Sequence, residues 1–288
     1  MIRLSVVYFG TPDFSARFLQ KIFENNQLPI DITAVVTQED KKIGRKLILT
    51  QSPVKKLAAA NSKKVFHDFP TDKYNLGLVF SYGRIIPRKI LDLFKFGVWI
   101  VHPSILPKYR GASPIAQALI DGEKETGVTL IIADEGIDTG EIIGQKKIEI
   151  NLNEKRDGLT GRLVNTACEL FEDTINEFIN NGFKINTIKQ EKLDYPITKK
   201  FKKEDGYIPF DKLINLSPSD SIMTYNRFRG LYPWPGIWTK IKINGQEKRL
   251  KIIEMEIKNN KLLFTKVQLE GKKEVEFNTF NLAHKIFI

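Results

Sequence analysis

Short apolar runs alternate with stretches of helical periodicity along the first 182 residues. The apolar runs have the length of buried strands and lie at residues 4–9, 32–36, 76–80, 98–102 and 128–132. The helical stretches lie at residues 14–24, 54–60, 88–93, 113–119 and 160–180. Alternating residues predict an edge strand at 142–150. Strands that alternate with helices in this way predict a doubly wound α/β domain.

Two local signals lie between the second and third of these strands. Residues 37–46 are polar, basic and punctuated by glycine, which predicts a long exposed loop. Ser52-Pro53 predicts a helix start, with Ser52 as the N-cap and Pro53 at the first helical position.

The pattern changes near residue 188. Residues 189–206 are rich in lysine and poor in core candidates, which predicts an interdomain linker. A helical stretch then precedes short β-type segments, at 219–229 and at 237–243, 249–257, 261–268 and 275–277. Asn244-Gly245 between two of these segments is a strong hairpin signal. We therefore expect an α/β domain at 1–188, the linker, and a small antiparallel β-barrel of the oligonucleotide-binding (OB) type at 207–288.

Charge suggests a class of partner. The 288 residues carry a formal net charge of +11. Residues 201–288 carry a net charge of +6 and the preceding 200 residues a net charge of +5. The charge per residue is therefore more than doubled in the last third, which favours a polyanionic partner such as nucleic acid.

Cysteine usage and hydropathy bear on the compartment. Cys168 is the single cysteine, so no internal disulfide can form, and its helical context predicts a small buried hydrophobe. No apolar stretch approaches the roughly 20 residues that span a bilayer. The first residues predict a strand and show neither a long apolar h-region nor a small-residue cleavage site, so no targeting segment is expected. We expect a cytoplasmic, monomeric protein that is not bound to a membrane.

Candidate chemistry follows two of the predicted strands. His102 ends the apolar run at 98–102, and Asp138 lies among glycines shortly after the run at 128–132. If both strands are parallel members of one sheet, their carboxyl ends share an edge, where ligands bind. We therefore expect His102 and Asp138 to meet over a substrate. The three histidines and one cysteine show no metal-ligand spacing, so no metal site is expected.

From end to end, the chain resembles the methionyl-tRNA formyltransferase family. The matching motifs are Val-Tyr-Phe-Gly-Thr-Pro-Asp-Phe at 7–14, Val-Thr-Gln at 36–38, Gly-Arg-Lys at 44–46, Ser-Pro-Val-Lys at 52–55, Tyr-Gly-Arg-Ile-Ile-Pro at 82–87, Val-His-Pro-Ser-Ile-Leu-Pro-Lys-Tyr-Arg-Gly-Ala-Ser-Pro-Ile at 101–115, Glu-Thr-Gly-Val-Thr at 125–129, Asp-Glu-Gly-Ile-Asp-Thr-Gly at 134–140 and Pro-Trp-Pro-Gly at 233–236. Their order and spacing cover most of the chain. The resemblance implies a Rossmann-like formyltransferase domain followed by an OB-like β-barrel.

The resemblance also implies an activity and its residues. Such enzymes move the formyl group of 10-formyltetrahydrofolate onto the amino group of methionyl initiator tRNA, without a metal, for translation initiation. The family uses an Asn, a His and an Asp, and His102 and Asp138 occupy the last two positions. The implied binding residues are Ser104, Ile105, Leu106 and Pro107 for folate, and Arg45 and Lys46 for tRNA.

One position departs from the family. The family's Asn lies two residues before its His, and here that position is Ile100. Residues 100 and 102 share one face of a strand, but isoleucine cannot donate a hydrogen bond to an oxyanion. Three interpretations remain open: a formyltransferase of reduced or compensated activity, a pseudoenzyme that binds tRNA or folate, and a sugar-amine N-formyltransferase.

Overall fold

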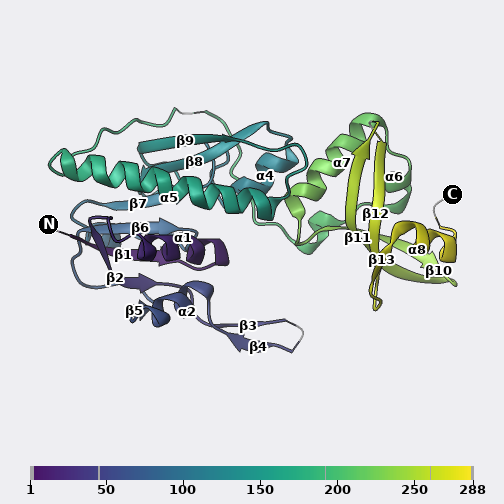
Figure 1. Cartoon of the computed structure of the whole chain (residues 1–288), viewed down its shortest axis with the longest axis horizontal. Coiled ribbons are helices and arrows are strands. Elements are labelled where there is room, and N and C mark those ends of the chain that lie inside the picture. Colours follow the sequence, from purple (N-terminus) through teal and green to yellow (C-terminus); the bar gives the residue numbers. More distant parts are fainter. Residues whose placement is uncertain (1–2, 45, 192, 260, 287–288) are drawn as a thin grey trace. The chain divides into compact units, whose positions relative to one another are not determined.

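The computed structural model describes residues 3–44, 46–191, 193–259 and 261–286, which fold into two units (Figure 1). Unit 1 comprises Met1–Pro114, Glu125–Glu149 and Thr160–Thr198. Unit 2 comprises Ile115–Lys124, Ile150–Leu159 and Lys199–Ile288. Two short segments that precede residue 160 therefore fold with the C-terminal part of the chain.

Unit 1 is built on a seven-stranded sheet of order β5-β2-β1-β6-β7-β8-β9. The strands are β1 (Leu4–Gly10), β2 (Ile30–Val36), β5 (Lys64–Phe66), β6 (Leu76–Phe80), β7 (Val98–His102), β8 (Glu125–Ile132) and β9 (Ile142–Glu149). The first five strands in this order pair in parallel. Strand β1 lies between β2 and β6, so the strand order reverses there, as in Rossmann-like sheets. The predicted edge strand is confirmed as β9.

The expected parallel arrangement of residues 98–102 and 128–132 is wrong. Strand β8 runs antiparallel to β7, with Trp99 opposite Ile132 and His102 opposite Thr129. The loop after β8 therefore starts at the far end of β7 and folds back to reach His102. An apolar run indicates that a strand is buried, but it gives no information on the direction of that strand. The sequence pattern therefore could not distinguish a parallel from an antiparallel pairing of these two strands.

The helices of unit 1 follow the predicted pattern. They are α1 (Asp13–Glu24), α2 (Pro53–Ala60), α3 (Arg88–Leu91) and the long α5 (Arg156–Asn180), which begins in unit 2. The Ser52 hydroxyl accepts a hydrogen bond from the Lys55 backbone N–H at 3.0 Å, which confirms the predicted N-cap. A Cβ on Gly144 of β9 would meet the side chains of Leu170 and Thr174, so α5 packs closely on that strand (Figure 1).

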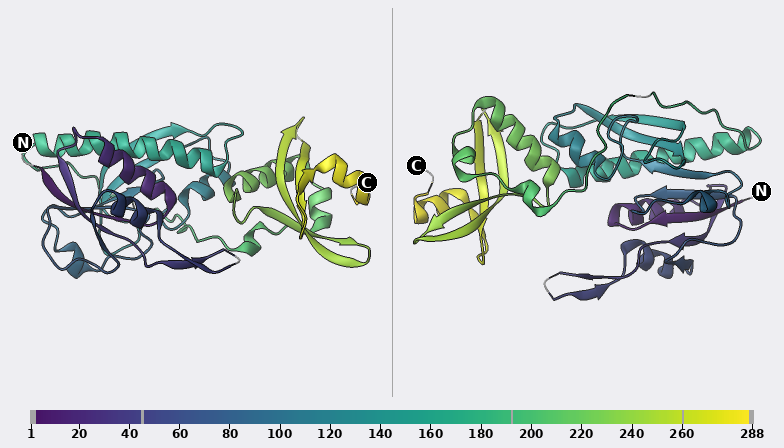
Figure 2. Two further views of the ribbon diagram at one scale, coloured as in Figure 1. Left: turned by 60° about the horizontal axis from the view of Figure 1, so that its bottom comes forward. Right: turned by 180° about the vertical axis from the view of Figure 1, so that it is seen from behind.

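The predicted loop at 37–46 contains part of a small hairpin. Its strands are β3 (Lys41–Ile43) and β4 (Ile48–Thr50), and they project from the rest of unit 1 (Figures 1 and 2). Leu47, Ile48 and Leu49 are all more than 60% exposed. Within the predicted loop, Thr37 is buried, whereas Lys41, Lys42, Gly44 and Lys46 are exposed. The prediction of exposure is therefore confirmed only for these later residues, and part of the expected loop forms strand β3.

Unit 2 contains an antiparallel sheet of order β10-β11-β12-β13 with helices beside it (Figure 2). Its elements are α4 (Pro114–Ile120), the 3₁₀ turn Lys203–Gly206, α6 (Phe210–Ile214), α7 (Pro218–Leu231), β10 (Ile237–Ile243), β11 (Gln246–Lys258), β12 (Lys261–Leu269), β13 (Glu274–Glu276) and α8 (Phe277–His284). Asn244 and Gly245 both have positive φ, at 51° and 77°, which confirms the hairpin turn. Helix α8 is a feature that the sequence pattern did not predict.

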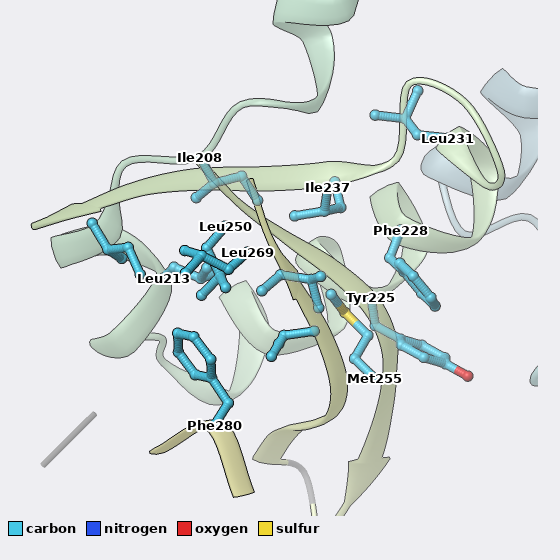
Figure 3. Close-up of a cluster of buried hydrophobic side chains, with 13 residues drawn as sticks. Ile208, Leu213, Tyr225, Phe228, Leu231, Ile237, Leu250, Met255, Leu269 and Phe280 are labelled. Atoms are coloured by element: carbon cyan, nitrogen blue, oxygen red, sulfur yellow. The ribbon is translucent and has the colours of Figure 1, made fainter. Parts of the chain in front are cut away.

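A cluster of buried side chains holds the unit 2 sheet and its helices together (Figure 3). Phe228 of α7, Leu250 of β11 and Phe280 of α8 are 3% exposed or less. Alternate residues of β10 are buried at positions 237, 239 and 241, so one face of the sheet covers the cluster. The antiparallel sheet that was expected of the C-terminal domain is therefore confirmed. Within the described residues, no helix is both long and apolar enough to cross a membrane.

Candidate functional site

His102 is the last residue of β7 and is 4% exposed. Its Nε2 atom lies 3.0 Å from the backbone carbonyl oxygen of Tyr109, which can only accept, so Nε2 donates this hydrogen bond. Tyr109 has a φ of 65°, in the left-handed region that a bulky residue seldom adopts. The loop after β7 thus turns back to place a carbonyl on the histidine ring.

Asp138 approaches the other nitrogen of the same ring. Its Oδ2 atom lies 3.4 Å from Nδ1 of His102 and accepts a hydrogen bond from the backbone N–H of Gly111 at 2.8 Å. Its backbone is left-handed, with a φ of 53°. The loop that carries it closes tightly, because a Cβ on Gly140 would overlap the carbonyl oxygen of Ile132. The structure therefore brings the two predicted residues together.

Ile100 lies on the His102 face of β7, but in apolar surroundings. It is half-buried and packs against an apolar cluster that includes Tyr82, Ile86 and Val98. Its partners on the neighbouring strands are Val79 and Ile131. The side chain thus extends the apolar core toward His102 and contributes no polar group.

The loop that was expected to bind folate turns two of its four side chains inward. Ser104 and Leu106 are buried, whereas Ile105 and Pro107 are half-buried. The Ser104 hydroxyl donates to the carbonyl oxygen of Lys108 at 2.7 Å, so its polar group is already used within the loop. Ile105 and Pro107 retain exposed surface for a ligand.

Strand β8 anchors the same loop. The buried Thr129 hydroxyl donates to the Ser104 carbonyl oxygen at 2.7 Å and accepts from the Leu106 N–H at 3.1 Å. Gln145 of β9 donates to the Leu106 carbonyl oxygen at 2.8 Å. The chain after His102 is therefore held rigidly against the antiparallel part of the sheet.

Of the two residues expected to contact tRNA, one can be placed in the structure. Arg45 lies outside the described residues. Lys46 is exposed in the turn between the two strands. The contacts of the His102–Asp138 pair described above do not involve Lys46.

Three site residues escaped the sequence prediction. Tyr109 supplies a carbonyl to His102, Gly111 supplies an N–H to Asp138, and Gln190 bonds to the Asp138 loop. Gly111 has a φ of 103°, and a Cβ there would come within 2.6 Å of the Thr198 carbonyl oxygen. Tyr109 and Gly111 lie within the matching motif at 101–115, whereas nothing in the local sequence marks Gln190.

Two other kinds of chemistry find no support in the described parts of the chain. Among the described residues, no group of three or more His, Cys, Asp or Glu side chains could hold a metal ion. Burial raises the pKa of the Cys168 thiol to about 12, so at neutral pH this thiol is not the anion that a nucleophile requires.

Family comparisons agree with this architecture. The Formyl transferase family profile matches residues 2–175, and the profile of the Formyl transferase C-terminal domain matches residues 200–263. The chain is 38% identical to the methionyl-tRNA formyltransferase of Caldicellulosiruptor saccharolyticus, over 88% of this chain and 80% of that protein.

Solved structures share the fold. The methionyl-tRNA formyltransferase from Clostridium thermocellum has a TM-score of 0.55 at 18% identity, covering 95% of this chain and 99% of that one. An N-formyltransferase from Helicobacter canadensis, solved with folinic acid and dTDP-3-aminofucose, has a TM-score of 0.59 at 22% identity, covering 90% and 89%. The N-terminal profile spans more than half of the chain, and a curated relative is 38% identical over 88% of it. The chain therefore belongs to the methionyl-tRNA formyltransferase family.

Proposed function

We propose that this protein transfers the formyl group of 10-formyltetrahydrofolate to the amino group of methionyl initiator tRNA. The observation that carries the proposal is the His102–Asp138 pair at the end of β7, in a chain 38% identical to a protein named methionyl-tRNA formyltransferase. The reaction forms a bond between the amine nitrogen and the formyl carbon, and breaks the bond from that carbon to the donor nitrogen.

His102 and Asp138 have the chemistry for the proton transfers of this reaction. The attacking amine must lose a proton, and the leaving nitrogen must gain one. An imidazole can serve both steps, and a neighbouring carboxylate orients the ring and stabilises it when both nitrogens are protonated. Because Nε2 of His102 is bonded to the Tyr109 carbonyl, we propose that substrate binding replaces that bond.

The oxyanion of the tetrahedral intermediate lacks a donor at position 100. The Ile100 side chain cannot hydrogen-bond, and removing one such donor typically lowers turnover by about 100- to 1000-fold. We therefore propose an enzyme whose chemical step is slow unless another group supplies that donor.

The proposed binding surfaces follow the family. We propose that the loop formed by Ser104, Ile105, Leu106 and Pro107 contacts the folate, mainly through its backbone and through its two half-buried side chains. We propose that Arg45, Lys46 and the basic C-terminal domain bind the tRNA phosphates. The division into residues 1–188, 189–206 and 207–288, and a monomeric state, belong to the same proposal.

Each of the two alternative functions has one observation in its favour. A sugar-amine N-formyltransferase is suggested by the bound sugar nucleotide named for the Helicobacter canadensis structure, but 22% identity supports the shared fold alone. A pseudoenzyme that binds tRNA or folate is suggested by Ile100. The 38% identity, over 88% of this chain, to a protein named methionyl-tRNA formyltransferase favours the tRNA substrate over the sugar.

A direct assay separates these functions. Purified protein is mixed with 10-formyltetrahydrofolate and charged initiator tRNA, and the formyl-methionyl product is quantified, with His102→Gln as the inactive control. We expect slow turnover with charged initiator tRNA and none with dTDP-linked amino sugars. Turnover of the sugar alone would overturn the proposal. Binding of tRNA and folate without turnover, in both this chain and Ile100→Asn, would establish the pseudoenzyme.

A further inference from the structure

The segment expected to be a plain linker is bonded to the loops that carry the site. This segment, here called the strap, is residues 187–191 and 193–198. Ile188 exchanges two backbone hydrogen bonds of 2.8 Å with Ile142 at the start of β9. Thr198 donates its N–H to the Arg110 carbonyl oxygen at 2.7 Å, and the Ala112 N–H donates to the Thr198 carbonyl oxygen at 3.1 Å. The strap therefore begins and ends on unit 1.

Gln190 lies midway along the strap, and its amide makes four hydrogen bonds. Nε2 donates to the carbonyl oxygens of Asp138 and Gly140, both at 2.8 Å. Oε1 accepts from Nε and Nη2 of Arg110, at 3.1 and 2.7 Å. A primary amide has two N–H donors and two oxygen lone pairs, so all of its capacity is used here.

The partners fix the orientation of this amide. Carbonyl oxygens can only accept and a guanidinium can only donate, so a rotation of the amide by 180° would oppose oxygen to oxygen and N–H to N–H. Gln190 is half-buried, and its amide therefore connects the two loops in a single orientation.

Those two loops are the ones that meet at His102. Arg110 precedes Gly111, whose N–H donates to the Asp138 carboxylate, and Asp138 is itself a carbonyl partner of Gln190. The contacts close a ring through Gln190, Arg110, Gly111 and Asp138. Because Asp138 has a left-handed backbone, its peptide needs external bonds to hold it there.

We propose that Gln190 is a positioning residue, which holds the Asp138 carboxylate against His102 by bonding the backbone of the Asp138 loop to Arg110. Its catalytic consequence rests on the proposed formyl transfer. Gln190 touches no reacting atom and acts through Asp138. The strap thereby makes the site depend on residues about 50 positions beyond the acidic loop.

Gln190→Glu is the sharpest test. It keeps the size of the side chain and an oxygen for Arg110, but it turns a carboxylate oxygen toward the carbonyls of Asp138 and Gly140. Misplacing a catalytic group by about 1 Å can cost on the order of 100-fold in rate. We expect kcat to fall by about that factor. KM for each substrate should change less than about threefold, because residues 104–107 are held by Thr129 and Gln145 rather than by Gln190.

Two further variants control for stability. Gln190→Met has similar length and no hydrogen bonds, and should also lower kcat. Thr187→Val lies on the same strap and removes only a solvent-exposed hydrogen bond to the Glu141 carboxylate, so its kcat should stay within about twofold. A kcat within twofold for Gln190→Glu, or a loss of activity that only tracks a fallen unfolding temperature, would overturn the proposal.

A second measurement tests the positioning role even if the formyl-transfer assay detects no product. The chain has three histidines, so the ring nitrogen signals of His102 can be assigned by NMR through loss of one set in His102→Gln. We expect the ring nitrogen signals of His102 to shift in Gln190→Glu and to be unchanged in Thr187→Val. Unchanged His102 signals in Gln190→Glu would refute the positioning role independently of the proposed activity.

Discussion

Nδ1 of His102 lies 3.4 Å from Oδ2 of Asp138, although His102 ends β7 and Asp138 lies in the loop that leaves the antiparallel neighbour β8 at its opposite end. The acidic loop after β8 must fold back along β7 to make this contact. Gly111 donates to the same Asp138 oxygen, and Gln190 bonds to the Asp138 carbonyl. The pair is therefore held by the packing of several loops rather than by one strand end.

This relationship predicts that Asp138→Asn lowers turnover strongly while the fold is kept. The amide retains an oxygen for the Gly111 N–H but removes the negative charge beside His102. General acid–base catalysis contributes about 100- to 10,000-fold, so we expect a loss of kcat in that range, measured by initial rates. The matched control is Asp134→Asn, because Asp134 bonds to Thr139 and Gly136 in the same loop. Equal losses in both variants would contradict an individual role for Asp138.

Restoring the family's amide should raise turnover. Ile100→Asn places a donor on the His102 face of β7, and we expect kcat to rise by up to about 100- to 1000-fold in single-turnover formyl transfer. Ile100→Leu keeps the apolar contacts and should give no rise. Placing the amide beside the apolar cluster should also lower the free energy of unfolding by roughly 1–3 kcal/mol where its polar atoms find no partner. An unchanged kcat in an active parent enzyme would show that another group already supplies the donor.

The β3–β4 hairpin should contribute a phosphate contact. Lys46 is exposed in its turn, so Lys46→Gln should weaken tRNA binding and reduce the slope of log affinity against log salt by about 1. Filter binding at several salt concentrations measures both quantities. Lys184→Gln removes an exposed lysine outside the hairpin and serves as the control. The same loss of slope in both variants would argue for general charge attraction rather than a hairpin contact.

Two helical glycines should respond to alanine with opposite signs. A Cβ on Gly161 of α5 would meet no atom nearer than 3.9 Å, so Gly161→Ala should raise the free energy of unfolding by about 0.5–1 kcal/mol. A Cβ on Gly230 of α7 would lie 2.6 Å from the Ala116 carbonyl oxygen and 2.7 Å from Ile120 Cγ1. Gly230→Ala should therefore lower the free energy of unfolding by about 1–3 kcal/mol. Urea unfolding measures both, and a change of the same sign in the two variants would contradict the packing.

Cys168 should be protected from alkylation in the folded protein. Burial raises its pKa from 9.0 to about 12, so at pH 8 the thiolate fraction falls on the order of 1000-fold relative to the unfolded chain. Iodoacetamide labelling with and without denaturant tests this directly, and similar rates in both conditions would contradict it.

The same shift predicts how stability depends on pH. The folded state holds the Cys168 proton more tightly than the unfolded state does. Its contribution to stability is therefore fully present below about pH 9 and is lost as the pH rises from 9 toward 12. Relative to Cys168→Ala, the native chain should lose stability across that range. If the free energy of unfolding changed with pH in the same way for both proteins, the raised pKa of Cys168 would be contradicted.

Local signals predicted many elements closely. The strand at residues 237–243 has the predicted bounds, the Asn244-Gly245 turn has two positive φ values, and Ser52 caps α2. These features depend on neighbouring residues. The three-residue β5 and helix α8 escaped prediction, because their short lengths offer little periodicity and their packing partners come from distant parts of the chain.

The sequence by itself determined the alternation of strands and helices, the basic C-terminal sheet, the apolar residue at position 100, and His102 and Asp138 as the candidate pair. Those features are carried by residue type and spacing. Only the tertiary structure decided that β8 is antiparallel, that Tyr109 and Gly111 complete the arrangement, and that Gln190 spans two loops. Strand direction and long-range hydrogen bonds depend on how distant segments pack. A local pattern of apolar and polar residues does not specify which distant segments those are.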